Sequence, residues 1–175
     1  NMIKTDVSLI GFVGSGKTTT GKKLAELLGF EFLDTDERVE EQEGMTIRRI
    51  FEEKGEEYFR QAETGLLETL LKEDGKRVIS TGGGMPLRPE NAVLLKKLGT
   101  VVYLRVSGPE VYERLKDTQD RPLLSGEDPK GTIEKLLTQR EPLYLSCAEI
   151  SVDTNGRSPD QIVQEILGAV KEEHD

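Results

Sequence analysis

The chain has 175 residues, a hydrophobic content of 35% and a net charge of −9 at pH 7, values typical of a single soluble domain. The acidic balance argues against non-specific binding to nucleic acid, and no apolar stretch is long enough to cross a bilayer. Cys147 is the only cysteine, which excludes an intramolecular disulfide and argues against a cysteine-based metal site. With no signal-peptide pattern, these features predict a cytoplasmic protein without a nucleic-acid or membrane partner, and nothing in them demands more than a monomer.

Apolar, β-rich runs alternate with helical patterns along the chain. Strands are predicted over residues 7–10, 30–33, 77–80, 100–106 and 149–152. Helices are predicted over 21–29, 59–70, 91–98, 110–115 and 158–170, although Gly65 weakens the second of them. Ser158, Pro159 and Gln161 supply the cap, first-turn proline and capping-box partner of the last helix. This alternation predicts a three-layer α/β/α domain built on a parallel sheet.

Two stretches interrupt the alternation within what we interpret as one domain, residues 1–175. Residues 37–58 are highly charged and predict helices without an intervening strand. Residues 117–131 are rich in glycine, proline and aspartate and show no helical face. Because long irregular insertions in compact domains are commonly functional, we interpret the first as a substrate-binding insertion and the second as a lid. Solvated surface insertions are the alternative interpretation of both.

The segment "GFVGSGKT", residues 11–18, matches the pattern G-x-x-x-x-G-K-[ST] between a predicted strand and a predicted helix. Its glycines allow backbone N–H groups to surround phosphate oxygens, and the helix directs its positive end at the same anion. In this pattern the lysine reaches the β- and γ-phosphates and the hydroxyl of the last residue ligates Mg²⁺. The sequence therefore predicts binding of ATP with Mg²⁺ at Gly14, Ser15, Gly16, Lys17, Thr18 and Thr19.

A phosphate-binding loop does not by itself distinguish a kinase from a GTPase or an ATP-driven machine. The chain has no Asn-Lys-x-Asp guanine-reading motif, and the strand over 100–106 does not end in acidic residues. The acidic pair Asp34 and Asp36 instead closes the second strand, and residues two apart in an extended segment face the same side. We expect one carboxylate to help hold hydrated Mg²⁺ and the other to accept a proton from an attacking hydroxyl. A solvated turn or a helix N-cap is the alternative.

Further arginines and glycines extend this candidate site. Arg60 lies on a predicted helix, where pairing with Glu56 or Glu57 is the alternative to a ligand contact. Three consecutive glycines, residues 82–84, follow a predicted strand. A simple turn needs only one or two glycines, and close approach of a ligand to the backbone would explain the third. Arg121 in the predicted lid and Arg140 complete a set of cations suited to phosphates or carboxylates.

Six segments, taken in order along nearly the whole chain, resemble the shikimate kinase family: "GFVGSGKTTTGKKLA", "FLDTD", "GEEYFRQAE", "STGGG", "DRPLL" and "QREPLY". The resemblance implies a P-loop fold of the nucleoside-monophosphate-kinase type with a central five-stranded parallel sheet. It also implies transfer of the γ-phosphate of ATP to the 3-hydroxyl of shikimate, a step toward chorismate and aromatic amino acids. Shikimate and ATP are then the small-molecule partners, and Mg²⁺ is the cofactor.

The resemblance also implies roles for individual residues. The catalytic set would comprise a phosphate-stabilising lysine, an acceptor base and a lid arginine, namely Lys17, Asp36 and Arg121. Thr18 would ligate Mg²⁺ directly and Asp34 through water. Groups binding the shikimate hydroxyls or carboxylate would be Asp36, Arg60, Gly82, Gly83, Gly84 and Arg140. Two arginines, Arg114 and Arg157, would flank the adenine and join Arg121 in binding ATP.

Met85 and Gly65 depart from the family pattern without removing a chemical group. Two alternative functions remain open at this point. A related small-molecule kinase, such as a gluconate kinase, shares the fold and the phosphate loop. A non-catalytic ATP-binding module would not need Asp36, the glycine triplet and a lid arginine together.

Overall fold

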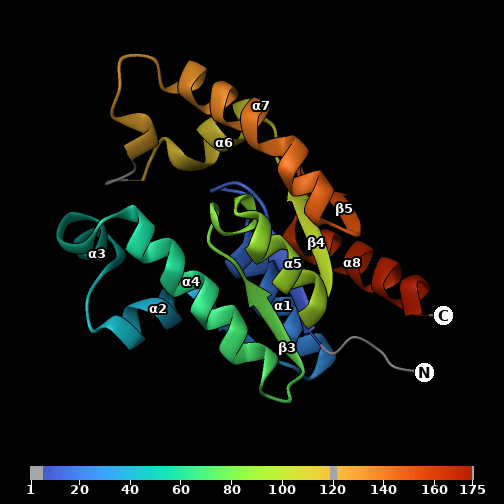
Figure 1. The fold of residues 1–175 in the computed structure, drawn as a ribbon. Coiled ribbons are helices and arrows are strands. Elements are labelled where there is room, and N and C mark those ends of the chain that lie inside the picture. The colour runs from blue at the N-terminus through green and yellow to red at the C-terminus, as the bar shows by residue number, and fades with distance from the viewer. Residues whose placement is uncertain (1–5, 119–121, 175) are drawn as a thin grey trace.

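The computed structural model describes residues 6–118 and 122–174 (Figure 1). Its centre is a five-stranded sheet in the order β2-β3-β1-β4-β5, in which every adjacent pair is parallel. The strands are β1 (Asp6–Ile10), β2 (Glu31–Asp34), β3 (Arg77–Ser80), β4 (Gly99–Arg105) and β5 (Ile150–Asp153). The predicted α/β class and the five-stranded parallel sheet are thus confirmed.

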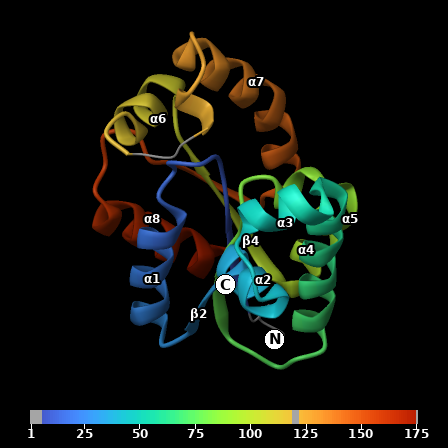
Figure 2. The same cartoon turned by 90° about the vertical axis from the view of Figure 1, so that its left-hand side faces the viewer.

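Helices cover both faces of the sheet (Figure 2). Val7 and Leu9 of β1 pack in a core with α1 (Lys17–Leu28) and α8 (Pro159–His174), whereas Ile10 packs in the opposite core. That second core includes α4 (Glu56–Leu71) and α5 (Pro89–Leu98). Neighbouring strand residues point to opposite faces, so a sheet buried on both sides needs apolar residues at nearly every position. No described helix is long and apolar enough to span a membrane.

Two short helices follow β2, as the charge pattern of residues 37–58 predicted. They are α2 (Thr35–Glu43) and α3 (Ile47–Lys54), and no strand separates them from α4. The Thr46 hydroxyl caps α3 by accepting from the Arg49 N–H at 3.2 Å. The Glu40 carboxylate accepts from the Ile47 N–H at 2.9 Å and ties the end of α2 to the start of α3. The helix bearing Arg60 continues through Gly65 without a break.

Beyond β4 lie α6 (Gly108–Leu115), the 3-10 turn η2 (Pro122–Leu124) and α7 (Pro129–Cys147), at the end of the sheet where the strands finish (Figures 1 and 2). No helix was predicted over α7, which contains Pro142, a residue that normally ends or kinks a helix. Asp128 caps this helix through the Gly131 N–H at 3.1 Å, so residues 129–131 of the predicted lid are helical. The expectation that 117–131 has no helical structure is therefore wrong for these residues and for η2.

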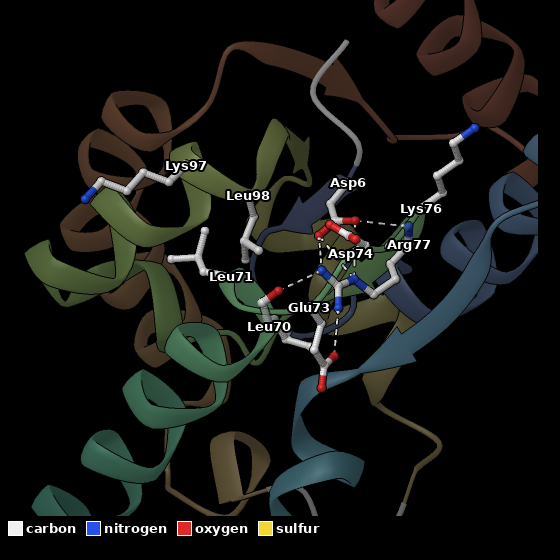
Figure 3. A pocket seen from close by; sticks show the side chains of 10 residues that line it. Asp6, Leu70, Leu71, Glu73, Asp74, Lys76, Arg77, Lys97 and Leu98 are labelled. Carbon is white, nitrogen blue, oxygen red and sulfur yellow. Dashed lines mark hydrogen bonds and ion pairs between the residues drawn. The ribbon is translucent and has the colours of Figure 1, made fainter. Parts of the chain in front are cut away.

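A buried ion pair joins the amino ends of β1 and β3, at the sheet edge opposite the phosphate loop (Figure 3). Asp6 is fully buried, and its Oδ2 lies 2.8 Å from the Nη2 of Arg77, which is 4% exposed. The same Nη2 donates to the Leu70 carbonyl at 3.0 Å, while Nη1 contacts Glu73 at 3.1 Å. These groups border a cavity of about 530 Å³. One guanidinium thus connects two strands to the end of α4.

We expect Asp6→Asn to lower the free energy of unfolding by about 3–5 kcal/mol, because it removes the buried counter-ion of Arg77 and leaves only the half-exposed Glu73 to pair with it. Urea denaturation measures this, and Glu52→Gln is the control because its pair with Arg48 is exposed and worth less than about 1 kcal/mol. The double variant Asp6→Leu/Arg77→Met should cost less than the sum of the two single changes. Equal losses for Asp6→Asn and Glu52→Gln would contradict the structural role of the pair.

Candidate active site

The phosphate-loop pattern occupies the turn between β1 and α1. Gly14 and Gly16 have φ angles of 84° and 88°, a region that residues with a Cβ rarely adopt. Gly16 is the N-cap of α1, and its carbonyl accepts from the Thr20 N–H at 2.9 Å. Thr18 and Thr19 are exposed in the first turn of that helix. The loop therefore has the strand–turn–helix context that the sequence pattern requires.

Lys17 reaches back over this loop. Its Nζ donates to the carbonyls of Gly11 at 2.6 Å and Phe12 at 3.1 Å. The residue is half-buried, but its ammonium group is enclosed, and burial lowers the pKa of Lys17 to about 8. Asp36 and Asp34 oppose that shift, while Arg140 adds to it. The ammonium thus lies within electrostatic reach of three other residues selected from the sequence.

The two aspartates do not occupy one extended segment, so the geometric premise for pairing them was wrong. Asp34 ends β2 and is the N-cap of α2, with its Oδ1 accepting from the N–H groups of Asp36 at 2.9 Å and Glu37 at 3.2 Å. Asp36 lies in the first turn of that helix. The N-cap alternative is therefore confirmed for Asp34, because a carboxylate satisfies the free N–H groups of a helix start.

Asp36 lies in the centre of the candidate site. Burial, followed by the charge of Asp34, raises the pKa of its carboxyl group, while Lys17 and Arg60 act in the opposite direction. A carboxylate with a raised pKa and two cations nearby has the properties of a group that exchanges protons with a ligand.

Two glycines of the triplet are required by the protein's own side chains. A Cβ on Gly82 would lie 2.6 Å from the Asp36 Oδ1, and one on Gly84 would lie 2.5 Å from an Arg60 nitrogen. A Cβ on Gly83 would have only ordinary contacts, the nearest being the Gly11 carbonyl oxygen at 3.7 Å. None of the three has a positive φ. The triplet therefore brings Asp36 and Arg60 against the backbone, and Gly83 lies within contact distance of the phosphate loop and of Arg140.

Glu63 is a residue of this site that the sequence analysis missed. Its Oε1 accepts from the Arg60 Nη1 at 2.7 Å, and the residue is fully buried. Burial raises the pKa of Glu63 to about 7, against the effect of Arg60. Its other oxygen has no hydrogen-bond partner in the described part of the chain. The sequence did contain a signal for this residue: Glu63 lies four residues after Phe59 and therefore on the apolar face of the helix, where a charged side chain is unusual. Arg60 also pairs with Glu56 at 3.5 Å, one of the two partners named as the alternative to a ligand contact.

Arg140 approaches the glycine triplet from α7. Its guanidinium stacks over the Phe12 ring at 5.4 Å and comes within 4.0 Å of the Cβ position of Gly83. The structure thus gathers Lys17, Asp36, Arg60, Arg140 and the glycine triplet at the carboxyl ends of β1 and β3.

The two arginines expected beside adenine lie on the other side of the phosphate loop. Arg114 donates to the carbonyls of Gly14 at 2.7 Å and Thr154 at 2.9 Å. Arg157 pairs with Glu165 at 2.6 Å and donates to the Asp153 carbonyl at 2.8 Å. Both line a cavity of about 370 Å³ together with Gly14, Ser15, Gly16 and Thr19. Arg121 lies outside the described residues.

Comparison with known proteins identifies the family. The family model described as shikimate kinase matches residues 13–171. The chain belongs to the shikimate kinase family. Shikimate kinase of Sulfurihydrogenibium sp. (strain YO3AOP1) is 46% identical over 166 residues, covering 95% of this chain and 98% of that protein. That of Thermodesulfovibrio yellowstonii is 44% identical over 162 residues, covering 93% and 92%. The resemblance stated from the motifs is therefore confirmed.

Solved structures agree with this family assignment. Shikimate kinase from Acinetobacter baumannii in complex with shikimate is 39% identical with a TM-score of 0.89, covering 97% of this chain and 94% of that one. A gluconokinase from Sinorhizobium meliloti reaches only 19% identity, with a TM-score of 0.60 and coverage of 98% and 94%. That second likeness extends to the fold alone.

Two glycines of this shikimate kinase family member make a matched pair for mutation. Gly84→Ala should displace the Arg60 guanidinium and weaken binding of the acceptor, and it should lower stability by about 1–3 kcal/mol because the displaced guanidinium no longer donates to the buried Glu63. Gly65→Ala, in the same region but with nothing within 4 Å of the added Cβ, should stabilise the protein by about 0.5–1 kcal/mol. Calorimetric titration with shikimate and thermal unfolding test both. If Gly84→Ala bound shikimate as tightly as the wild type, the result would contradict a contact between Arg60 and shikimate.

The raised pKa of Glu63 predicts a pH-dependent contribution to stability. From pH 4.5 to about 7 the folded protein retains a proton that the unfolded chain releases, so the free energy of unfolding falls as pH rises through this window. Titration of Glu63 lowers the free energy of unfolding by at most about 3 kcal/mol over this window. Glu63→Gln should lack it, and urea denaturation of both proteins at pH 5 and pH 8 measures the difference. A constant difference between them would show that Glu63 titrates normally.

Proposed function

We propose that this chain catalyses transfer of the γ-phosphoryl group of ATP to the 3-hydroxyl of shikimate, giving shikimate 3-phosphate and ADP. The observation that carries the proposal is the convergence of Lys17, Asp36, Arg60 and Arg140 around the glycine triplet. The relative from Acinetobacter baumannii, described as a complex with shikimate, supports this acceptor.

The acceptor would bind by its charge and its hydroxyl groups. Arg60 and Arg140 would hold the shikimate carboxylate, since a planar guanidinium can donate two parallel hydrogen bonds to it. Glu63 would orient Arg60 through the 2.7 Å contact. The backbone of Gly82, Gly83 and Gly84 would contact the ring substituents. Asp36 would bind the hydroxyl groups and accept the proton of the attacking one, a task suited to its raised pKa.

The nucleotide would occupy the other side of the phosphate loop. Its phosphates would take hydrogen bonds from loop N–H groups, including those of Gly14, Ser15, Gly16 and Thr19, at the positive end of α1. Lys17 would exchange its two carbonyl partners for phosphate oxygens. Arg114 and Arg157 would flank the adenine in the 370 Å³ cavity, whose walls they already form.

Magnesium fits the oxygen donors at this edge of the sheet. The Thr18 hydroxyl is exposed at the start of α1, and the half-buried Asp34 carboxylate lies near Lys17. Mg²⁺ retains several waters and takes few protein ligands, so a hydroxyl with a water-mediated carboxylate suits it. The described residues contain no group of three or more acidic, histidine or cysteine side chains that would form a separate metal site. When bound, Mg²⁺ supplies neutralisation of phosphate charge.

The transfer would proceed in line, without a covalent enzyme intermediate, and would depend on positioning and charge neutralisation. Residues 117–131 would act as the lid that excludes water, carrying Arg121 to the phosphates. Residues 37–58 would be the substrate-binding insertion of a single domain, residues 1–175. We also propose that the enzyme is monomeric and cytoplasmic, in line with its composition.

A coupled assay of ADP release with Mg-ATP tests the function by comparing shikimate, gluconate and no acceptor. Turnover that requires shikimate is the expected result. Release of ADP with gluconate instead would agree with the assignment of the phosphate loop and contradict the assignment of the shikimate-binding residues. Binding of ATP without acceptor-dependent turnover would identify a nucleotide-binding module.

Asp36→Asn should reduce kcat by about 100-fold or more while ATP binding, measured by calorimetry, stays within about twofold. Arg140→Ala is the companion variant, and it should raise the KM for shikimate at least about tenfold more than the KM for ATP. Loss of ATP binding by Asp36→Asn would contradict the role of base. Equal increases in both KM values would contradict the carboxylate contact of Arg140.

A further inference from the structure

The glycine triplet is held by hydrogen bonds that fix successive peptide groups. The Gly82 N–H donates to the hydroxyl of Thr35, a fully buried residue in the first turn of α2, at 3.0 Å. The Gly82 carbonyl accepts from the Met85 N–H at 3.1 Å. Because a peptide unit is planar, these bonds set the orientation of the units before and after Gly82. Glycine backbone rotates more freely than that of other residues, so such bonds decide where its N–H groups point.

The third peptide unit, between Gly83 and Gly84, is held by Tyr144. The Tyr144 hydroxyl donates to the Gly83 carbonyl at 2.8 Å. Tyr144 lies in the last part of α7, 61 residues from Gly83 in the chain, and is fully buried. Burial raises the pKa of this hydroxyl, against the effects of Arg140 and Arg60, so it remains protonated and able to donate at neutral pH.

Tyr144 also follows Arg140 by four residues on the same helix, so the two side chains share one face. The bond to Gly83 therefore ties the helix that carries Arg140 to the backbone proposed to contact the acceptor. The opposite end of α7 begins at Pro129, directly after Asp128 of the proposed lid. A single hydroxyl thus connects α7 with the glycine triplet.

We infer that Tyr144 is a positioning residue for the acceptor: its hydroxyl fixes the Gly83–Gly84 peptide and the distance of Arg140 from it. This inference rests on the proposed shikimate kinase activity. Tyr144 lies behind the carbonyl of Gly83 and acts through the backbone and through Arg140 rather than by touching the phosphoryl group. Loss of the hydroxyl should therefore weaken acceptor binding more than it slows phosphoryl transfer.

The chain contains a matched control. Tyr103 of β4 packs its ring against Tyr144 with centroids 5.1 Å apart, and it is 1% exposed. Tyr103 lines a different cavity, with Arg105, Glu141 and Asp153. Tyr103→Phe and Tyr144→Phe each remove one hydroxyl from the same aromatic pair, but only the second removes the bond to Gly83.

Steady-state kinetics of the wild type and both variants test the inference. Tyr144→Phe should raise the KM for shikimate about five- to tenfold, the equivalent of one lost hydrogen bond, with kcat and the KM for ATP within about twofold. Tyr103→Phe should leave all three within about twofold. Equal effects of the two variants, or an equal rise in both KM values for Tyr144→Phe, would overturn the role assigned to Tyr144.

A second measurement separates this inference from the proposed activity. The amide resonance of Gly84, recorded by NMR without substrates, should shift in Tyr144→Phe and stay in place in Tyr103→Phe. An unchanged Gly84 resonance would overturn the inference even if shikimate is the substrate. A wild-type protein that is inactive with shikimate would instead contradict the proposed kinase activity, and the NMR comparison would still test the contact between Tyr144 and Gly83. If Tyr144→Phe is too unstable to assay, the same comparisons are made in the Gly65→Ala background.

Discussion

At the carboxyl ends of β1, β2 and β3, three cations and three carboxylates share a region from which the protein partly excludes water. The cations are Lys17, Arg60 and Arg140, and the carboxylates are Asp34, Asp36 and Glu63. Removing charges from water is costly unless they are paired, and here burial moves the pKa of Lys17 down to about 8 and that of Glu63 up to about 7. Anionic ligands would compensate the lysine and arginine charges, which gives the free site a physical reason to bind phosphate and carboxylate together.

The backbone geometry around this site follows from the same crowding. A Cβ on Gly82 or Gly84 would collide with Asp36 or Arg60, respectively. Gly14 and Gly16 have positive φ angles, which the phosphate loop requires and which other residues rarely adopt. Two of the charged groups are held by short hydrogen bonds, Arg60 by Glu63 and the capping Asp34 by the start of α2. Such pre-positioning lowers the entropy lost when a ligand binds, and it suits a reaction that depends on alignment rather than on covalent chemistry.

Elements distant in the sequence meet at the glycine triplet. Thr35 from α2 and Tyr144 from α7 bind its backbone, and Asn91 from α5 donates to the Met85 carbonyl at 3.0 Å. The helices proposed to hold the acceptor and to carry the lid therefore both donate hydrogen bonds to, or accept them from, one segment of three glycines. Movement of either helix relative to the sheet would be transmitted to the backbone beside the acceptor, because these side chains are buried and have little freedom to adjust.

The sequence by itself determined the class of fold, the phosphate loop and the family. Strand alternation and the spacing of Gly11, Gly16 and Lys17 are local patterns that local backbone preferences enforce. Tertiary structure decided what these patterns left open: Asp34 caps α2 instead of pairing with Asp36 in a strand, α7 continues through Pro142, and the buried Glu63 and Tyr144 lie at the site. Those outcomes depend on which side chains meet across the sheet edge and how deeply they are buried, and contacts between residues 61 positions apart leave no periodic signal in a single sequence.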